Sequence, residues 1–434
     1  MSGAQQRLVA IVVVILVLAG VIVYGLNAGE GEAAADPSLT PSVVGSESPV
    51  PSGAPTAAPS PAGEDAVLAA LAEIEEQVIE IRGLPAADIG PPDLLTRDEA
   101  RAELMAAFDE DYPQEERDED NAALRALGLL EADQDVAELQ LQLIGDQVLG
   151  FYDDEEKRMV VVTDAGLDAL AKFTYAHEYA HALQDAAFGI ASLERDADRE
   201  DDRGLARTAL LEGDASVVML AWAFEHLTPQ ELLQITSTPP PDTSGIPSWL
   251  VEYLVVFPYN EGLLWAGALS GDPTAPDFGP IDAAYEAPPD STEQIIDVDK
   301  WDPREDPIPV EGPDLAAALG ADWTEVEDTP IGQAFLRMIL EYHGIDNAEA
   351  VEASTGWGAD RAVTAIGPGD AFAVAWRLAW DTPQDADEFV EAYNAVIPSL
   401  GFPASVTELA DDEVLVAHGS TPEILRRAVA AADD

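Results

Sequence analysis

The chain has 434 residues, of which 84 are acidic and 20 are basic, so its formal net charge is −64. A surface this negative repels phosphate and excludes nucleic acid as a partner, whereas a hydrophobic content of 47% is enough to build folded cores. Because the sequence has no cysteine, it excludes disulfides, thiolate metal ligands and a cysteine nucleophile, and any bound metal must use histidine and carboxylate side chains.

The acidity also suggests a hypothesis about the environment of the protein. A dense coat of carboxylates suits a protein in high salt, where self-repulsion is screened; the alternative is a merely acidic surface without halophilic adaptation. In either case the negative field disfavours acidic substrates and favours neutral or basic ones.

The N-terminal region predicts a membrane anchor. The stretch from Leu8 to Leu26 carries no charge and, at about 1.5 Å per residue, spans roughly 28 Å. Arg7 precedes it and acidic residues follow it, so residues 1–7 are expected in the cytoplasm and the rest of the chain outside. The alternative is a cleaved signal peptide, which usually has a shorter apolar core.

A linker and several helices follow. Residues 27–63 are rich in Ala, Pro, Ser and Gly and predict an extended linker. Beyond it, apolar residues recur at three- and four-residue spacing and predict one helix face: Val67, Leu71, Ile74, Val78 and Ile81. A capping-box pattern at Thr96 begins a second helix. Further helical patterns cover residues 115–127 and 135–146.

The next segment changes to strand periodicity. VLGFY and RMVVV flank the polar stretch DDEEK, which predicts a β-hairpin over residues 148–162. A long helix is expected from about residue 164 to 188. The helices and the hairpin belong to a predicted domain over residues 64–302.

That long helix contains an HExxH pattern, His177-Glu178-Tyr179-Ala180-His181. Residues i and i+4 share one helix face, so the two imidazoles can bind one zinc ion while Glu178 lies beside it. The alternative is a surface helix with two unrelated histidines.

A catalytic zinc ion needs a third protein ligand. The next helical segment, about residues 203–227, offers Glu212 in ALLEGDAS, where small and apolar neighbours indicate a buried carboxylate. Buried carboxylates usually have a partner, so Glu212 is the expected third ligand. Asp214 is an alternative, either as the ligand or as an acceptor that orients a histidine.

The C-terminal region alternates strand and helix. A segment rich in proline and acids at residues 303–313 marks a boundary, and residues 329–343 follow as a helix. Further on, AFAVAWRLAW and EVLVAHG read as strands, and DADEFVEAYNAVI and PEILRRAVAA as helices. Residues 303–434 therefore predict a small α+β unit.

The sequence resembles a known family beyond the metal-binding pattern. HEYAHALQDAAFG followed by LLEGDA is similar to uncharacterised membrane-anchored or secreted bacterial proteins, predicted to be zinc peptidases of the HExxH plus Glu, gluzincin-like type. The similarity covers most of residues 65–380 and includes EIRGL (80–84), GFYDDEEKRMVVV (150–162), FPYNEGLLW (257–265), PPDSTEQII (288–296) and GWGADR (356–361). It implies a fold and a hydrolase but no substrate. One departure is visible after STEQ, where the family usually has a histidine and this chain has Asp297.

The expected chemistry follows from the metal site. Zinc lowers the pKa of bound water to about 7 and polarises the scissile carbonyl, while Glu178 acts as base and then as acid towards the leaving amine. The oxyanion needs a hydrogen-bond donor. Tyr259, in the family-like FPYNEG motif, is the first candidate and His226 is the second; the alternative for both is an ordinary packing role.

We therefore predict an α+β protein with a helix-rich zincin-like core, a β-hairpin before the HExxH helix and a small C-terminal α+β unit. The expected function is that of a Zn²⁺-dependent peptidase, anchored in the cell membrane by one N-terminal helix, with peptide or protein substrates outside the cytoplasm. Two alternatives are a non-catalytic envelope-binding protein on a zincin fold and a zinc amidase acting on cell-envelope material. The intact Glu178 favours an enzyme.

Overall fold

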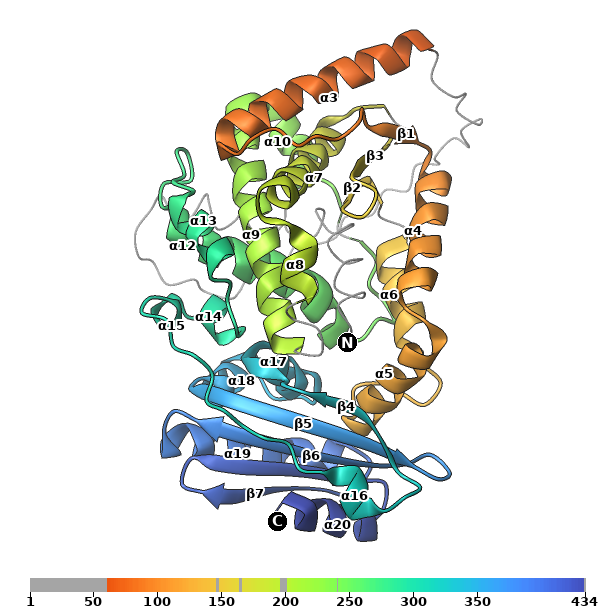
Figure 1. Cartoon of the computed structure of the whole chain (residues 1–434), viewed down its shortest axis with the longest axis vertical. Coiled ribbons are helices and arrows are strands. Elements are labelled where there is room, and N and C mark those ends of the chain that lie inside the picture. The colour runs from red at the N-terminus through yellow and green to blue at the C-terminus, as the bar shows by residue number, and fades with distance from the viewer. Residues whose placement is uncertain (1–60, 146–147, 164–165, 196–200, 240, 433–434) are drawn as a thin grey trace, which may run out of the picture.

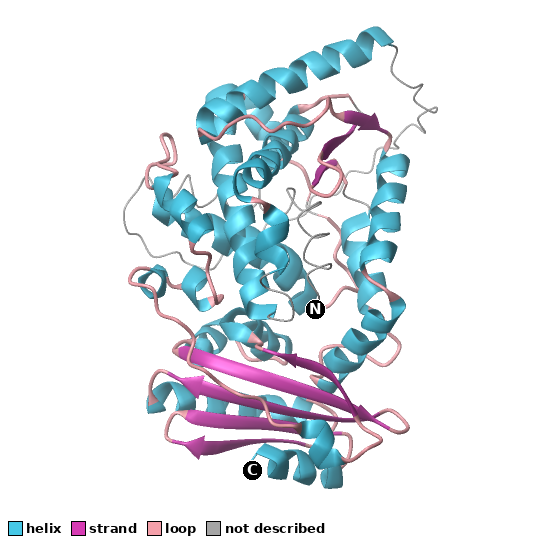
Figure 2. Cartoon of the chain, in the orientation of Figure 1, coloured by secondary structure: helices cyan, strands magenta, loops and turns pink. Residues whose placement is uncertain are grey.

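The protein combines a helical part with a sheet of five antiparallel strands (Figures 1 and 2). The computed structural model describes residues 61–145, 148–163, 166–195, 201–239 and 241–432. Helices and strands both contribute, which confirms the predicted α+β class.

The helical part contains all the residues that the sequence proposes for the site. Its first elements are α3 (Pro61–Arg82), β1 (Asp93–Leu95), α4 (Arg97–Asp111), α5 (Gln114–Ala126), α6 (Val136–Gly145), β2 (Gly150–Asp153), β3 (Arg158–Val162), α7 (Ala169–Phe188), α8 (Ile190–Arg195), α9 (Asp201–His226) and α10 (Pro229–Thr236). It continues with α11 (Ser248–Val251), the π-helix η1 (Glu252–Glu261), α12 (Gly262–Ser270), α13 (Gly279–Glu286), α14 (Glu293–Ile296) and α15 (Val298–Trp301).

The C-terminal part is built on the five-stranded sheet, with strand order β4-β5-β6-β8-β7. Its elements are α16 (Leu315–Leu319), β4 (Thr324–Thr329), α17 (Gly332–Tyr342), α18 (Asn347–Ser354), β5 (Trp357–Gly367), β6 (Ala371–Trp380), α19 (Pro383–Val396), the 3₁₀-helix η2 (Ile397–Ser399), β7 (Ala404–Ala410), β8 (Glu413–Gly419) and α20 (Pro422–Ala432). The helices and strands predicted here from residue 329 onward are confirmed, whereas β4, β5 and β7 were not predicted.

Helix α7 lies at the centre of the helical part and packs against α3, α9 and β2. It begins where the Asp168 side chain accepts a hydrogen bond from the Ala171 N–H, and it ends at Gly189, whose φ of 76° is in the left-handed region. All residues from Phe173 to Asp185 are buried. The HExxH segment is therefore a core helix, and the alternative of a surface helix is wrong.

A small sheet covers one side of α7. Strands β2 and β3 form the predicted hairpin, with Phe151 opposite Val160. Strand β1 pairs in parallel with β3 on its other side, so β2 is an edge strand of this sheet. The Thr96 capping box before α4 is confirmed as well.

The two faces of the five-stranded sheet are both covered. Side chains alternate along a strand, and accordingly Ala373 and Ala375 contact the cluster that contains α16 and α20, while Val374 and Trp376 belong to the main core. That main core extends without interruption from α7 and α9 to the sheet. The predicted division at residue 303 stays a prediction.

His418 on β8 connects the sheet to the helical part. Its side chain is fully buried, with Nδ1 2.8 Å from the carbonyl oxygen of Ala126 at the end of α5 and Nε2 2.8 Å from the hydroxyl of Tyr393. A carbonyl only accepts, so Nδ1 carries the proton and Nε2 accepts from Tyr393. Burial lowers the pKa of His418 to about 4.

The low pKa of His418 makes stability depend on pH. In the unfolded chain the imidazole titrates near 6.5, so between that pH and about 4 the unfolded state binds a proton that the folded state does not. We expect the free energy of unfolding to fall by up to about 3 kcal/mol more in the wild type than in His418→Gln on acidification from pH 7 to 4. Urea unfolding of both proteins across this pH range measures the difference. If the free energy of unfolding depends on pH equally in both, the low pKa of His418 is contradicted.

The predicted membrane anchor and the location outside the cytoplasm need correction. Within the described residues, no helix is both long enough and apolar enough to cross a membrane. The long helix α3 has 22 residues but includes several glutamates, as in LAEIEEQVIEIR, and is not such a helix. The predicted span 8–26, its cytoplasmic flank 1–7 and nearly all of the linker 27–63 lie outside the described residues.

Candidate metal centre

Helix α7 carries His177, Glu178 and His181, of which Glu178 and His181 line a cleft. All three side chains are buried, with exposed fractions of 0%, 2% and 4%. The i, i+4 spacing places the two imidazoles on one face, and their Nε2 atoms are 3.0 Å apart. Two histidine nitrogens at this distance need a proton or a cation between them.

Helix α9 packs against α7 and brings Glu212 to the same point. Glu212 is fully buried, and its Oε2 lies 2.9 Å from Nε2 of His177 and 3.5 Å from Nε2 of His181. In the described part of the chain these three residues form a group of donors that could hold one metal ion.

The geometry of the three donors suits zinc. Ligand atoms about 2.0–2.2 Å from a tetrahedral zinc ion lie roughly 3.3–3.6 Å from one another. The observed separations of 2.9, 3.0 and 3.5 Å are at or slightly below that range. Two imidazoles and one carboxylate are also ligands that zinc accepts, and they leave a fourth position for water or substrate.

The electrostatics of the three donors favour a positive charge between them. Burial opposes ionisation, yet the interaction of Glu212 with the two histidines lowers its pKa to about 2. Burial lowers the pKa of His177, whereas at His181 the Glu212 carboxylate outweighs burial and raises the pKa to about 9. A buried carboxylate thus stays ionised beside the two imidazoles.

Gln184 fixes the orientation of His181. The Gln184 amide nitrogen donates to the carbonyl oxygen of Leu211 and to Oδ2 of Asp214, each at 3.0 Å, so its Oε1 faces Nδ1 of His181 at 2.8 Å. His181 therefore donates from Nδ1, so Nε2 is the nitrogen that faces the other donors and that could bind a metal ion in the neutral imidazole. Asp214 contacts Gln184 and is not in the group of three donors found among the described residues.

Asp214 is itself held by a buried ion pair. The Arg82 Nε lies 2.9 Å from Oδ1 of Asp214, the Tyr285 hydroxyl donates to Oδ2 at 2.9 Å, and Arg82 also contacts Asp282 at 2.6 Å. Arg82 belongs to the EIRGL segment and Asp214 to LLEGDA, so two segments of the family-like pattern meet here. The arrangement anchors α3 to the helix that carries Glu212.

Glu178, the expected base, is held by the small sheet beside α7. Its Oε2 accepts a hydrogen bond from the backbone N–H of Tyr152 on the edge strand β2, at 3.2 Å. Burial raises the pKa of Glu178 to about 8, and a carboxylate whose pKa is close to neutral is a better proton acceptor than an ordinary glutamate. Tyr152 is anchored in turn, because its hydroxyl donates to Asp185 at 2.7 Å.

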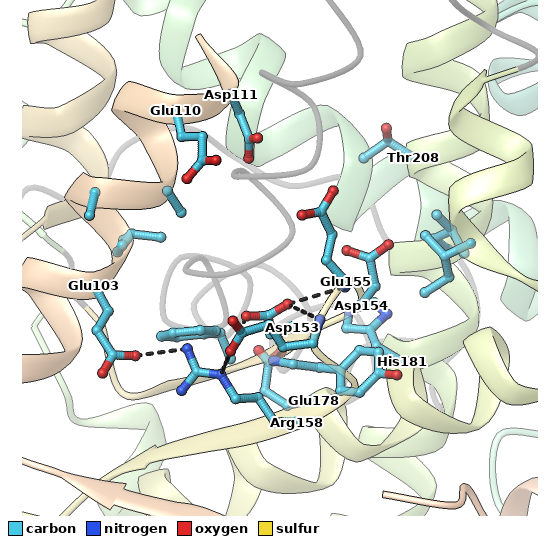
Figure 3. A pocket seen from close by; sticks show the side chains of 18 of the residues that line it. Glu103, Glu110, Asp111, Asp153, Asp154, Glu155, Arg158, Glu178, His181 and Thr208 are labelled. Atoms are coloured by element: carbon cyan, nitrogen blue, oxygen red, sulfur yellow. Dashed lines mark hydrogen bonds and ion pairs between the residues drawn. The ribbon is translucent and has the colours of Figure 1, made fainter.

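A cleft of about 440 Å³ opens over these residues. It lies between α4, the β2–β3 hairpin and α9, and Glu178, His181 and Glu212 are among its lining residues. Figure 3 shows Glu178 and His181 low in the cleft, with Glu110 and Asp111 reaching in from α4 and Thr208 on the α9 side. The volume is typical of sites that bind a small ligand or a short peptide segment.

The two candidate oxyanion donors lie elsewhere. Tyr259, on η1, is fully buried and its ring stacks on His177 with centroids 5.7 Å apart, but it is not among the residues that line the cleft. His226 lies next to Trp222 in a separate hollow beside Phe224. A catalytic role for Tyr259 stays a prediction.

Sequence reasoning missed three residues around the site: Gln184, Arg82 and Tyr285. Gln184 lies three residues after His181, on the same helix face, so helical spacing alone could have identified it. Arg82 and Tyr285 are far from Asp214 in the chain. Of these two, only Arg82 gave a sequence signal, because it lies within the EIRGL segment.

Comparison with known proteins identifies only the C-terminal part. Residues 322–428 match a family described as Domain of unknown function (DUF8575). These residues run from just before β4 into α20, so they contain the five-stranded sheet but not the candidate metal centre. No curated protein and no solved structure matches the chain.

Proposed function

We propose that the protein is a zinc-dependent hydrolase with a zincin-like core that cleaves peptide bonds. One observation carries this proposal: two imidazole nitrogens and one carboxylate oxygen lie 2.9–3.5 Å apart, and two of these donor residues, His181 and Glu212, line a cleft together with Glu178. A purely structural role does not require a base beside the three donors. An amidase would use the same groups, so the substrate decides between the two.

In this proposal the side chains divide the chemistry between them. His177, His181 and Glu212 hold the metal, and bound zinc supplies polarisation of the scissile carbonyl and activation of water. Glu178 takes the proton of the attacking water and delivers it to the leaving amine. The N–H of Tyr152 keeps the Glu178 carboxylate aimed into the cleft.

Hydrolysis is tested by profiling a mixed peptide library together with cell-envelope amides. The as-purified protein, the chelator-treated protein and the chelator-treated protein with zinc restored are compared. We expect peptide cleavage that disappears with the chelator and returns with zinc. Cleavage of envelope amides alone would favour the amidase, and no cleavage of either would remove the enzyme proposal.

Metal binding is tested separately from activity. We expect about one zinc per chain, with affinity reduced more than about 100-fold in His177→Ala, His181→Ala and Glu212→Ala. Gln184→Met, which removes only the support of His181, should weaken binding by about 10- to 100-fold. Elemental analysis and zinc titration measure this. If Glu212→Ala kept its full zinc content and Asp214→Ala lost it, Asp214 would be the third ligand instead of Glu212.

A further inference from the structure

The cleft over the candidate metal centre is far more acidic than the rest of the molecule. Nine of its nineteen lining residues are Asp or Glu, against 84 of 434 in the whole chain. Apart from Glu178 and Glu212, the acidic lining residues are Glu103, Glu110, Asp111, Asp153, Asp154, Glu155 and Glu156. The general acidity of the protein therefore does not account for the composition of this cleft.

Arg158 does not offset this charge for a ligand. It is the one arginine or lysine among the described lining residues. Its guanidinium is 2.8 Å from both Glu103 and Glu156, 3.5 Å from Asp153 and 3.4 Å from Asp93. The positive charge is thus already shared among carboxylates of the same region, and the lining residues themselves carry more negative than positive charge.

The acidic groups lie on opposite walls. Glu110 and Asp111 project from the end of α4, while Asp154 and Glu155 belong to the turn between β2 and β3 (Figure 3). The lining also includes six apolar residues: Leu104, Ala106, Ala107, Phe151, Ile190 and Leu211. Apolar side chains in the same cleft as carboxylates suit lysine and arginine, whose aliphatic stems pack on apolar groups while their charged ends meet the carboxylates.

A second feature of the cleft also points to a ligand. Glu212 is fully buried, and its Oε1 has no hydrogen-bond partner among the described residues although it lies on the lining. An ionised carboxylate oxygen in this state needs a cation or a donor from outside the chain. This is the place of the proposed metal ion, so the acidic lining surrounds a candidate ligand site and is not only a patch of surface.

We propose that the substrates of this cleft are cationic peptide segments, with lysine or arginine on both sides of the bond that is cleaved. This inference rests on the proposed peptidase function for the cleavage step, but the preference for cationic peptides can be measured by binding alone. The negative charges on the two walls attract the positive charges of such a peptide and repel acidic peptides.

Binding is measured with three labelled nine-residue peptides, in which alanine alternates with lysine, glutamine or glutamate. The full chain carrying Glu178→Gln is used so that the peptides stay intact. We expect the lysine peptide to bind at least about tenfold more tightly than the glutamate peptide at low salt. The difference should shrink as monovalent salt rises from about 0.05 to 0.5 M, since salt screens exposed charges.

Paired variants locate the effect. Adding Glu110→Gln and Glu155→Gln, one from each wall, should weaken binding of the lysine peptide about 3- to 10-fold. Binding of the glutamine peptide should change by no more than about twofold. Glu352→Gln with Glu391→Gln is the matched control, because it removes the same charge from exposed positions on α18 and α19, outside the cleft. Equal losses in both pairs would show a general field effect and overturn the proposal.

The outcomes separate this inference from the proposed function. Selective binding of the lysine peptide without zinc-dependent hydrolysis of any peptide would support the cationic cleft and contradict the peptidase. Zinc-dependent hydrolysis of neutral, acidic and cationic peptides at equal rates, with equal binding, would support the peptidase and overturn the cationic preference. Thermal melting of every variant shows that the fold is kept.

Discussion

Replacing Glu178 with glutamine is expected to lower kcat/KM for peptide hydrolysis by about 10²- to 10⁴-fold while the zinc content stays at the wild-type level. Glutamine has nearly the same size and can still contact the Tyr152 N–H through its carbonyl oxygen. It cannot accept the proton of water at neutral pH. The substitution thus removes the proposed proton transfer and leaves the three proposed metal ligands in place.

Two further variants make this result specific. Tyr259→Phe tests the predicted oxyanion donor, whose ring stacks on His177 but is absent from the cleft lining. His226→Ala serves as a control, because His226 lies in a different hollow. Hydrolysis by Glu178→Gln at the wild-type rate, with zinc bound, would require a different base.

The local part of the site could be predicted from the sequence. The positions of His177, Glu178 and His181 on one helix follow from helical spacing within five residues, and the hairpin from 148 to 162 follows from strand periodicity. Glu212 could be proposed because a carboxylate among small apolar residues has few other reasons to be buried. These signals depend only on neighbours in the chain.

The support of the site depends on contacts between distant segments. Arg82 and Asp214 are 132 residues apart, and nothing near either residue indicates the other. The π-helix η1, which contains Pro258 and places Tyr259 against His177, has no distinct sequence pattern either. Strand β4 was missed because TEVEDT is polar and lies at the edge of the sheet, with three of its six residues exposed.

Two glycines that are distant in the sequence also meet next to the candidate metal centre. Gly213 follows Glu212 on α9, and Gly262 begins α12; both belong to family-like segments. A Cβ atom at Gly213 would lie 2.2 Å from the carbonyl oxygen of Gly262, and one at Gly262 would lie 2.3 Å from that of Ala209. The two helix backbones are therefore in direct contact at the residue next to the third ligand.

We expect Gly213→Ala to destabilise the fold by about 3 kcal/mol or more and to lower zinc affinity, because α9 must move away from α12 and carries Glu212 with it. The control is Gly267→Ala on α12, where an added Cβ meets nothing within 4 Å. Alanine has the higher helix propensity, so this variant should be unchanged or stabilised by up to about 1 kcal/mol. Denaturant unfolding and zinc titration of both variants measure the difference. A Gly213→Ala protein with wild-type stability and zinc affinity would show that this close packing does not position Glu212.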